Sequence, residues 1–429
     1  MASIKPERVS ILGNITWLTS ANLAVKPVWL LFVLVFCWRY LGTSGYGSFS
    51  AALWLAFIGA SFTDLGLSTF TVREVARSPH EADVYFTNLL MLTGGLSLFV
   101  VVATVGAATQ LHDDRSEVLA VGWASIYATA LAVTSYVRSY FRAAEKLRYE
   151  GISVVVEKVC VVALGTLFLI AWRTPDAVLL GMAVGMCLTL AMNVAFVTRR
   201  LARFIPTAVD PAFMVASLRR ALPIGFFSIF IVVYLRIGGV LLEVWHGSAA
   251  AGEFGAAYRI IEALSLLPTV VTAALLPRLS TQFHVGDEPG FRSLLKRGVL
   301  ASLAIATACS AVLSLAAKPL LLIINPDPSA VQAGAVLAGL VWIFPLMAVN
   351  SLLIVALLAG NDQRYLAFML GMTTVVSLLL NLVLTRPLGV WGLVATLTLT
   401  EILICVLAAV RYRRVSAIRF DSTVPESAS

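Results

Sequence analysis

The sequence predicts an all-α polytopic membrane protein with about 12 transmembrane helices, arranged as two parallel six-helix lobes around a central cavity. Hydrophobic residues make up 59% of the 429 residues and charged residues only 13%, about half the charged share of a soluble domain. Apolar runs of about 20 residues, the length with which a fully hydrogen-bonded helix crosses a bilayer, recur along the whole chain. An internal repeat, described below, predicts the two lobes.

The expected spans are twelve apolar runs, several of which contain polar interruptions. Lys26 and Pro27 interrupt the first run, and Arg259, Glu262 and Pro268 interrupt the eighth. The runs cover residues 11–38, 48–70, 84–109, 117–137, 151–172, 177–198, 221–243, 253–277, 298–317, 330–359, 365–385 and 388–410.

Basic residues between the spans predict the orientation of the chain. If the N-terminus is cytoplasmic, 22 of the 31 Lys and Arg residues fall in the inner segments, which include 71–83, 138–150 and 199–220, and five fall in the outer loops. Such a bias over short loops predicts cytoplasmic termini. It also accounts for the net charge of +8 without nucleic-acid binding.

Two registers of internal similarity divide the chain into halves. At an offset of 205 residues, the segment 42–52 aligns with 247–257, so that Gly42, Gly47 and Phe49 meet identical residue types, and Arg73 falls on Arg278. At an offset of 216, the segment 144–149 aligns with 360–365. Since each half then starts on the cytoplasmic side, the halves are predicted to be parallel repeats. The expected parts are an N-lobe of residues 1–198, an amphipathic linker of 199–220 and a C-lobe of 221–429.

Catalytic and metal chemistry are not expected. The five cysteines, Cys37, Cys160, Cys187, Cys309 and Cys405, all lie in apolar spans, and the four histidines lie in loops or at span edges. No HExxH, P-loop or nucleophile-elbow motif occurs in the sequence. The sequence therefore predicts a protein that is not an enzyme, with no catalytic residues, no cofactor and no metal site.

Two stretches of the chain carry recognisable motifs. The first comprises 41–50, 64–67 and 73–76; the second comprises 252–262 and 276–280. Both resemble signatures of the polysaccharide flippases, the Wzx-like branch of the multidrug/oligosaccharidyl-lipid/polysaccharide exporter (MOP) superfamily, which also holds the MATE drug exporters and the lipid II flippases. The resemblance implies alternating access and a lipid-linked oligosaccharide substrate, typically on undecaprenyl pyrophosphate, moved from the cytoplasmic to the periplasmic leaflet. The chain differs from the lipid II branch, which usually has two further helices.

Ionisable side chains inside spans are costly and are therefore the candidate site residues. For a pyrophosphate-linked substrate we expect contacts from Arg236, Arg259 and Lys26, with Glu262 on the same helical face as Arg259. Arg259 and Glu262 could equally form a neutral structural pair, and Lys26 could extend toward the headgroups. Asp64 and Glu401 are candidates for ion coupling.

The leading hypothesis is a flippase of the bacterial inner membrane. Its expected partners are the lipid bilayer, a lipid-linked oligosaccharide, and possible polysaccharide polymerases and glycosyltransferases. A MATE-type drug or metabolite exporter is the alternative with the same fold, although such an exporter would favour acidic residues in its cavity. A membrane enzyme of glycan assembly is a less favoured alternative, because the outer loops are short.

Overall fold

The computed structural model describes residues 11–421, which form helices and short connections without a β-strand in that range. Nine helices of these residues are long and apolar enough to cross a membrane, and a bent pair of helices makes a tenth. Two of these ten candidate spans contain a non-helical break, one at Gly42 and one at Gly247. Each of the two is long enough for two crossings. The expectation of an all-α polytopic membrane protein is therefore confirmed.

The chain divides into two compact units, Met1–Gly252 and Glu253–Ser429. The boundary falls inside the helix α8, so the part of α8 that precedes it packs within the first unit. The assignment of residues 221–252 to a C-lobe, like the cavity between two lobes, stays a prediction.

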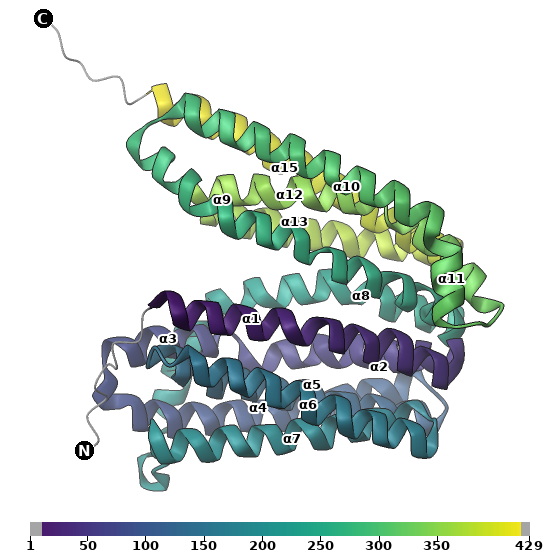
Figure 1. Ribbon diagram of the computed structural model, residues 1–429. Helices are drawn as coiled ribbons and strands as arrows, with labels where there is room; N and C mark the ends of the chain where they lie inside the picture. Colours follow the sequence, from purple (N-terminus) through teal and green to yellow (C-terminus); the bar gives the residue numbers. More distant parts are fainter. Residues whose placement is uncertain (1–10, 422–429) are drawn as a thin grey trace, which may run out of the picture. The chain divides into compact units, whose positions relative to one another are not determined.

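The first unit is a bundle in which α4, α5, α6 and α7 lie side by side (Figure 1). The helix α5 lies at its centre, in contact with α2, α3, α4 and α7, and buries three tyrosines, Tyr127, Tyr136 and Tyr140. The elements are α1 (Ile11–Leu30), the π-helix η1 (Leu31–Cys37), α2 (Trp38–Asp64), α3 (Leu67–Arg77), the short 3-10 helix η2 (Pro79–Glu81), α4 (Ala82–Leu111), α5 (Arg115–Ala143), α6 (Leu147–Trp172), α7 (Pro175–Arg200), the 3-10 helix η3 (Pro206–Ala208) and α8 (Pro211–Leu264).

In the second unit, the helix α12 lies between α9, α10 and α15 (Figure 1). Its core at one end joins Leu279, Phe291 and Leu352. The elements after α8 are α9 (Leu266–Val285), α10 (Glu288–Ile324), α11 (Ser329–Leu340), α12 (Ile343–Ala359), α13 (Gln363–Leu380), the π-helix η4 (Asn381–Thr385), α14 (Arg386–Leu388) and α15 (Val390–Asp421). The pair α11 and α12, bent by 40°, forms one broken span.

Large apolar side chains on the outside of both units require a lipid environment. Leu98 and Phe99 on α4, and Leu315 and Ile323 on α10, are each more than two-thirds exposed. Side chains of this kind would be unfavourable in water over such long helices, whereas acyl chains solvate them.

The two copies of the repeated segment make reciprocal contacts within the first unit. Each begins at a glycine in the left-handed region, Gly42 with φ 70° and Gly247 with φ 81°, where a glycine is strongly favoured. Five residues further on, a Cβ on Gly47 would lie 1.6 Å from the carbonyl oxygen of Ser248, and a Cβ on Gly252 would lie 2.0 Å from that of Thr43.

This pairing has the pattern of a two-fold axis. At the offset of 205, Thr43 corresponds to Ser248 and Gly47 corresponds to Gly252, so each copy presents the same glycine to the same carbonyl of the other. Contacts that exchange in this way are typical of a two-fold interface. The side-chain hydroxyls of Ser44 and Ser248 are also hydrogen-bonded there, at 2.7 Å.

The structure corrects the expected limits of several segments. Residues 138–150 do not form a loop, because α5 continues to Ala143 and buries Arg138. The segment 199–220 is helical at both ends, and its second half continues directly into the seventh span as α8. The eighth span, expected at 253–277, is interrupted at Ser265, between α8 and α9.

Candidate functional site

Two of the expected cationic site residues, Lys26 and Arg236, belong to the first unit. Lys26 is exposed on α1, directly before Pro27. Arg236 is half-buried on α8, and its guanidinium carbon lies 5.4 Å from the centre of the Phe57 ring. That distance is within the range of a cation–π contact, which orients the guanidinium group beside α2.

Arg259 and Glu262, near the end of α8 in the second unit, form an ion pair. The Arg259 guanidinium donates to the Glu262 carboxylate at 2.7 Å. Arg259 is buried, whereas Glu262 is half-buried. The arrangement is that of a neutralised pair on one helical face, and the convergence of Arg259 with Arg236 stays a prediction.

The two acids considered for ion coupling both accept hydrogen bonds from protein groups. Asp64, the last residue of α2, accepts from the backbone N–H of Ser68 at 3.0 Å and from the Ser68 hydroxyl. Asp64 therefore satisfies one of the backbone N–H groups in the first turn of α3, whose N-cap residue is Gly66. Glu401 on α15 is buried and accepts from the Asn350 side-chain amide on α12 at 2.7 Å.

A buried network in the first unit involves Arg138, which the sequence prediction had placed in a loop. The Glu157 carboxylate on α6 forms ion pairs with the Arg138 guanidinium, at 2.8 Å, and with the Lys158 ammonium, at 2.7 Å. Arg138 also donates to the hydroxyl and carbonyl oxygens of Ser153, and that hydroxyl donates to Asn193 on α7. The network therefore links α5, α6 and α7, and we interpret its role as structural.

An arginine-lined pocket opens between α3 and the start of α8. Its volume is about 550 Å³, within the range of ligand pockets. Arg73, Arg77 and Arg220 line it together with Glu74, whose carboxylate lies 3.7 Å from the first two arginines. Three guanidinium groups against one carboxylate leave the pocket positive, a setting suited to phosphate or another anion. Arg73 belongs to the repeated signature; Arg220 joins it only through the fold.

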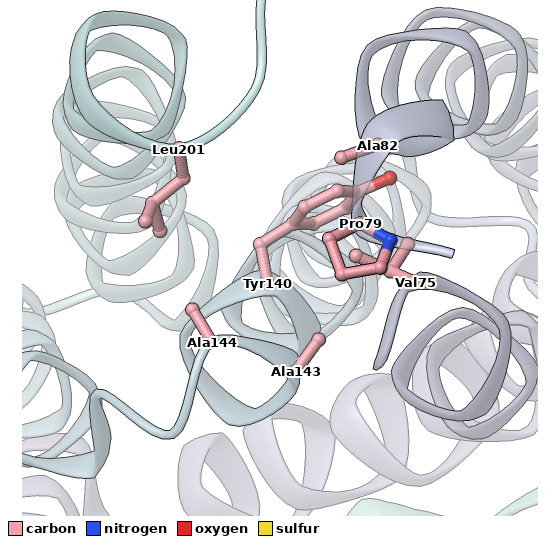
Figure 2. A pocket seen from close by; sticks show the side chains of 7 residues that line it. All are labelled: Val75, Pro79, Ala82, Tyr140, Ala143, Ala144 and Leu201. Carbon is pink, nitrogen blue, oxygen red and sulfur yellow. The ribbon is translucent and has the colours of Figure 1, made fainter. Parts of the chain in front are cut away.

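A second cavity nearby is too small for a substrate (Figure 2). Its volume is about 40 Å³, space for a few water molecules. The Tyr140 ring faces it, and the Tyr140 hydroxyl is engaged with that of Tyr136 at 3.1 Å. The lining residues are Val75, Pro79, Ala82, Tyr140, Ala143, Ala144 and Leu201.

The structure also gathers His112, Glu117 and Glu243, a set that sequence reasoning missed. The His112 Nδ1 atom lies 2.9 Å from the Glu117 carboxylate and 3.7 Å from the Glu243 carboxylate. No local motif could have revealed this set, because Glu243 lies on a helix far from the other two residues in sequence.

Comparison with known proteins is consistent with this architecture. Residues 11–283 match the family described as "Polysaccharide biosynthesis protein". No curated protein matches the sequence.

Solved structures with the same fold include three transporters. An inward-facing MATE family multidrug resistance transporter of the MOP superfamily has a TM-score of 0.73 at 14% identity, over 94% of this chain and 96% of the other. The lipid II flippase MurJ, in an inward closed conformation, has a TM-score of 0.73 at 12% identity, over 95% and 91%. A MOP superfamily transporter from Pyrococcus furiosus has a TM-score of 0.61 at 13% identity, over 97% and 99%.

These likenesses show that the chain has the fold of MOP superfamily transporters. The family match extends over more than half of the sequence, from α1 into α9. It includes both signature stretches and ends before α10. The resemblance inferred from those signatures is confirmed, and the chain belongs to the polysaccharide biosynthesis protein family.

Proposed function

We propose that the protein is a flippase that moves an undecaprenyl-pyrophosphate-linked oligosaccharide from the cytoplasmic to the periplasmic leaflet, by alternating access, for surface polysaccharide biosynthesis. The observation that carries the proposal is the polysaccharide biosynthesis family match in a chain with a transporter fold. In this scheme the chain resides in the bacterial inner membrane with both termini in the cytoplasm. Polysaccharide polymerases and glycosyltransferases act before or after it.

The charges of the described residues favour an anionic substrate. Arg73, Arg77 and Arg220 give one pocket a net positive charge, and Arg236 is held in a span beside an aromatic ring. A guanidinium group matches the oxygens of a phosphate with two parallel hydrogen bonds. Either the arginine-lined pocket or Arg236 would pair with a pyrophosphate while the polyprenyl chain remains in lipid.

The acidic residues argue against the organic-cation exporter. Such a transporter would favour carboxylates directed at its cationic substrate. Asp64 and Glu401, the candidate acids in the spans, instead accept hydrogen bonds from Ser68 and Asn350. Glu262 pairs with Arg259.

Substitution of Arg236 tests the proposal in cells. In a strain that lacks the chromosomal gene, Arg236→Ala and Arg236→Lys should both reduce export of surface glycan at normal membrane levels, because Lys keeps the charge but loses the two-pronged geometry. Arg199→Lys, a change at the exposed end of α7, is the matched control and should export normally.

Arg259 requires a paired design because of its ion pair. If Arg259 contacts the substrate, Arg259→Ala lowers export and Arg259→Ala with Glu262→Ala does not restore it. The Arg236→Ala and Arg259→Ala double variant should then be little worse than the poorer single one, since both groups act on one ligand. Normal export from both single alanine variants would contradict the proposed roles of these arginines.

A further inference from the structure

His112, Glu117 and Glu243 come from three segments of the first unit and converge on one point. His112 directly follows α4, Glu117 lies in the first turn of α5, and Glu243 lies on α8 shortly before the break at Gly247. One ligand atom from each lies within 4.8 Å of the other two. Ser48 on α2 donates to the second oxygen of Glu117 at 3.3 Å.

The buried carboxylate of Glu243 is directed into this cluster. Its side chain is only 6% exposed, and its ion-pair partner among residues 11–421 is His112 at 3.7 Å. That separation is beyond hydrogen-bonding reach. The Nδ1 atom lies closer to the Glu117 carboxylate, at 2.9 Å, and a ring nitrogen with one proton can donate to only one of the two acids. Glu243 is thus a buried acid beside a second acid, an arrangement that is costly while both are ionised unless a cation lies between them.

We propose that these three residues bind a divalent transition-metal ion, with Zn²⁺ as the best match. An imidazole nitrogen and two carboxylate oxygens are a ligand set that Zn²⁺ accepts, with water in a fourth position. Ligands at about 2.0–2.2 Å from a tetrahedral ion lie roughly 3.3–3.5 Å from one another, so His112 and Glu117 would move slightly apart and Glu243 would move closer to them. The Ser48 hydroxyl orients Glu117, as outer-shell groups commonly do in metal sites.

A metal ion at this point would fasten α8 to the turn between α4 and α5. The repeat predicts that the seventh span belongs to the C-lobe, whereas the structure packs this part of α8, like His112 and Glu117, within the first unit. On the proposed topology this end faces the periplasm, so the ion would hold the seventh span against α4 and α5 on the outer side. This regulatory role rests on the proposed transport function; the metal site itself does not.

Direct binding to the full-length protein in detergent tests the site. We expect titration calorimetry to show one Zn²⁺ ion per chain, and Zn²⁺ but not Mg²⁺ to raise the unfolding temperature. His112→Ala and Glu243→Gln should each weaken Zn²⁺ binding by about tenfold or more, since even outer-shell changes have effects of this size. Glu243→His, which supplies another zinc ligand, should retain binding and so separates ligand loss from misfolding.

His80→Ala and Glu81→Gln are matched controls in the exposed 3-10 helix η2, directly before α4, and both should bind Zn²⁺ as the wild type does. Absence of Zn²⁺ binding by the wild type, equal binding by His112→Ala, or equal loss in the controls would each overturn the site. In transport assays, Zn²⁺ should slow the wild type but not His112→Ala. A wild type that binds Zn²⁺ yet moves no lipid-linked glycan would contradict the proposed function but not the proposed metal site.

Discussion

Replacement of Gly47 by alanine tests the close contact between the two repeated segments. A Cβ at this position would lie 1.6 Å from the Ser248 carbonyl oxygen and 2.8 Å from the Gly252 nitrogen. Carbon and carbonyl oxygen normally approach to about 3.3 Å, so the two segments would have to separate by more than an ångström. Both obstacles are backbone atoms, which no change of rotamer can move.

The expected cost follows from that displacement. Overpacking a core with one methyl group costs about 1–3 kcal/mol, and a clash with backbone should reach the upper end. A loss of about 3 kcal/mol would lower the unfolding temperature by roughly 6–12 °C in a unit of this size. Gly252→Ala should act in the same direction, since its Cβ would lie 2.0 Å from the Thr43 carbonyl oxygen.

Thermal unfolding of the purified chain in detergent, with size-exclusion profiles, measures this effect. Gly106→Ala is the matched control, because Gly106 lies within α4 and a Cβ there meets nothing within 4 Å. That variant should be neutral or gain up to about 1 kcal/mol from helix propensity. Equal unfolding temperatures for Gly47→Ala and Gly106→Ala would refute the reasoning.

The other predictions concern buried charge and topology. Glu157→Gln should lower the free energy of unfolding by about 3 kcal/mol, because it leaves two cations without their buried counter-charge. Adding Lys158→Met should recover part of the loss, and denaturation of the wild type and of both variants in detergent measures the two effects. Glu401→Gln should preserve the fold, since it keeps an acceptor for its amide partner, but should abolish any response of transport to an imposed pH gradient. Reporter fusions should place Ser429 in the cytoplasm and the loop at Asp113 in the periplasm, and a periplasmic signal at Ser429 would contradict the parallel repeats.

The features that sequence could predict are those encoded locally. Apolar runs predict helices of membrane length because the bilayer sets their length. The repeated glycines predict equivalent backbone features, and both Gly42 and Gly247 indeed have positive φ. The pairing of Arg259 with Glu262 also follows from local spacing, because residues three apart share a helical face.

Contacts between distant helices could not be predicted in this way. Arg138 had the sequence context of a loop arginine, yet it forms an ion pair with Glu157 on the next helix, in the interior of the bundle. Glu243 meets His112 only because α8 packs beside the turn between α4 and α5. Charge and periodicity place such residues along the chain, whereas their partners depend on how the helices pack.

Reconstituted translocation is the measurement that tests the proposed flippase most directly. The purified chain would be incorporated into vesicles with an undecaprenyl-pyrophosphate-linked oligosaccharide in one leaflet, and a membrane-impermeant glycosidase would report the glycan that reaches the other. We predict that the glycan becomes accessible faster than in protein-free vesicles, and that Arg236→Lys slows this transfer. Accessibility equal to that of protein-free vesicles, with folded protein present and the glycan drawn from the same cell, would contradict the proposed function.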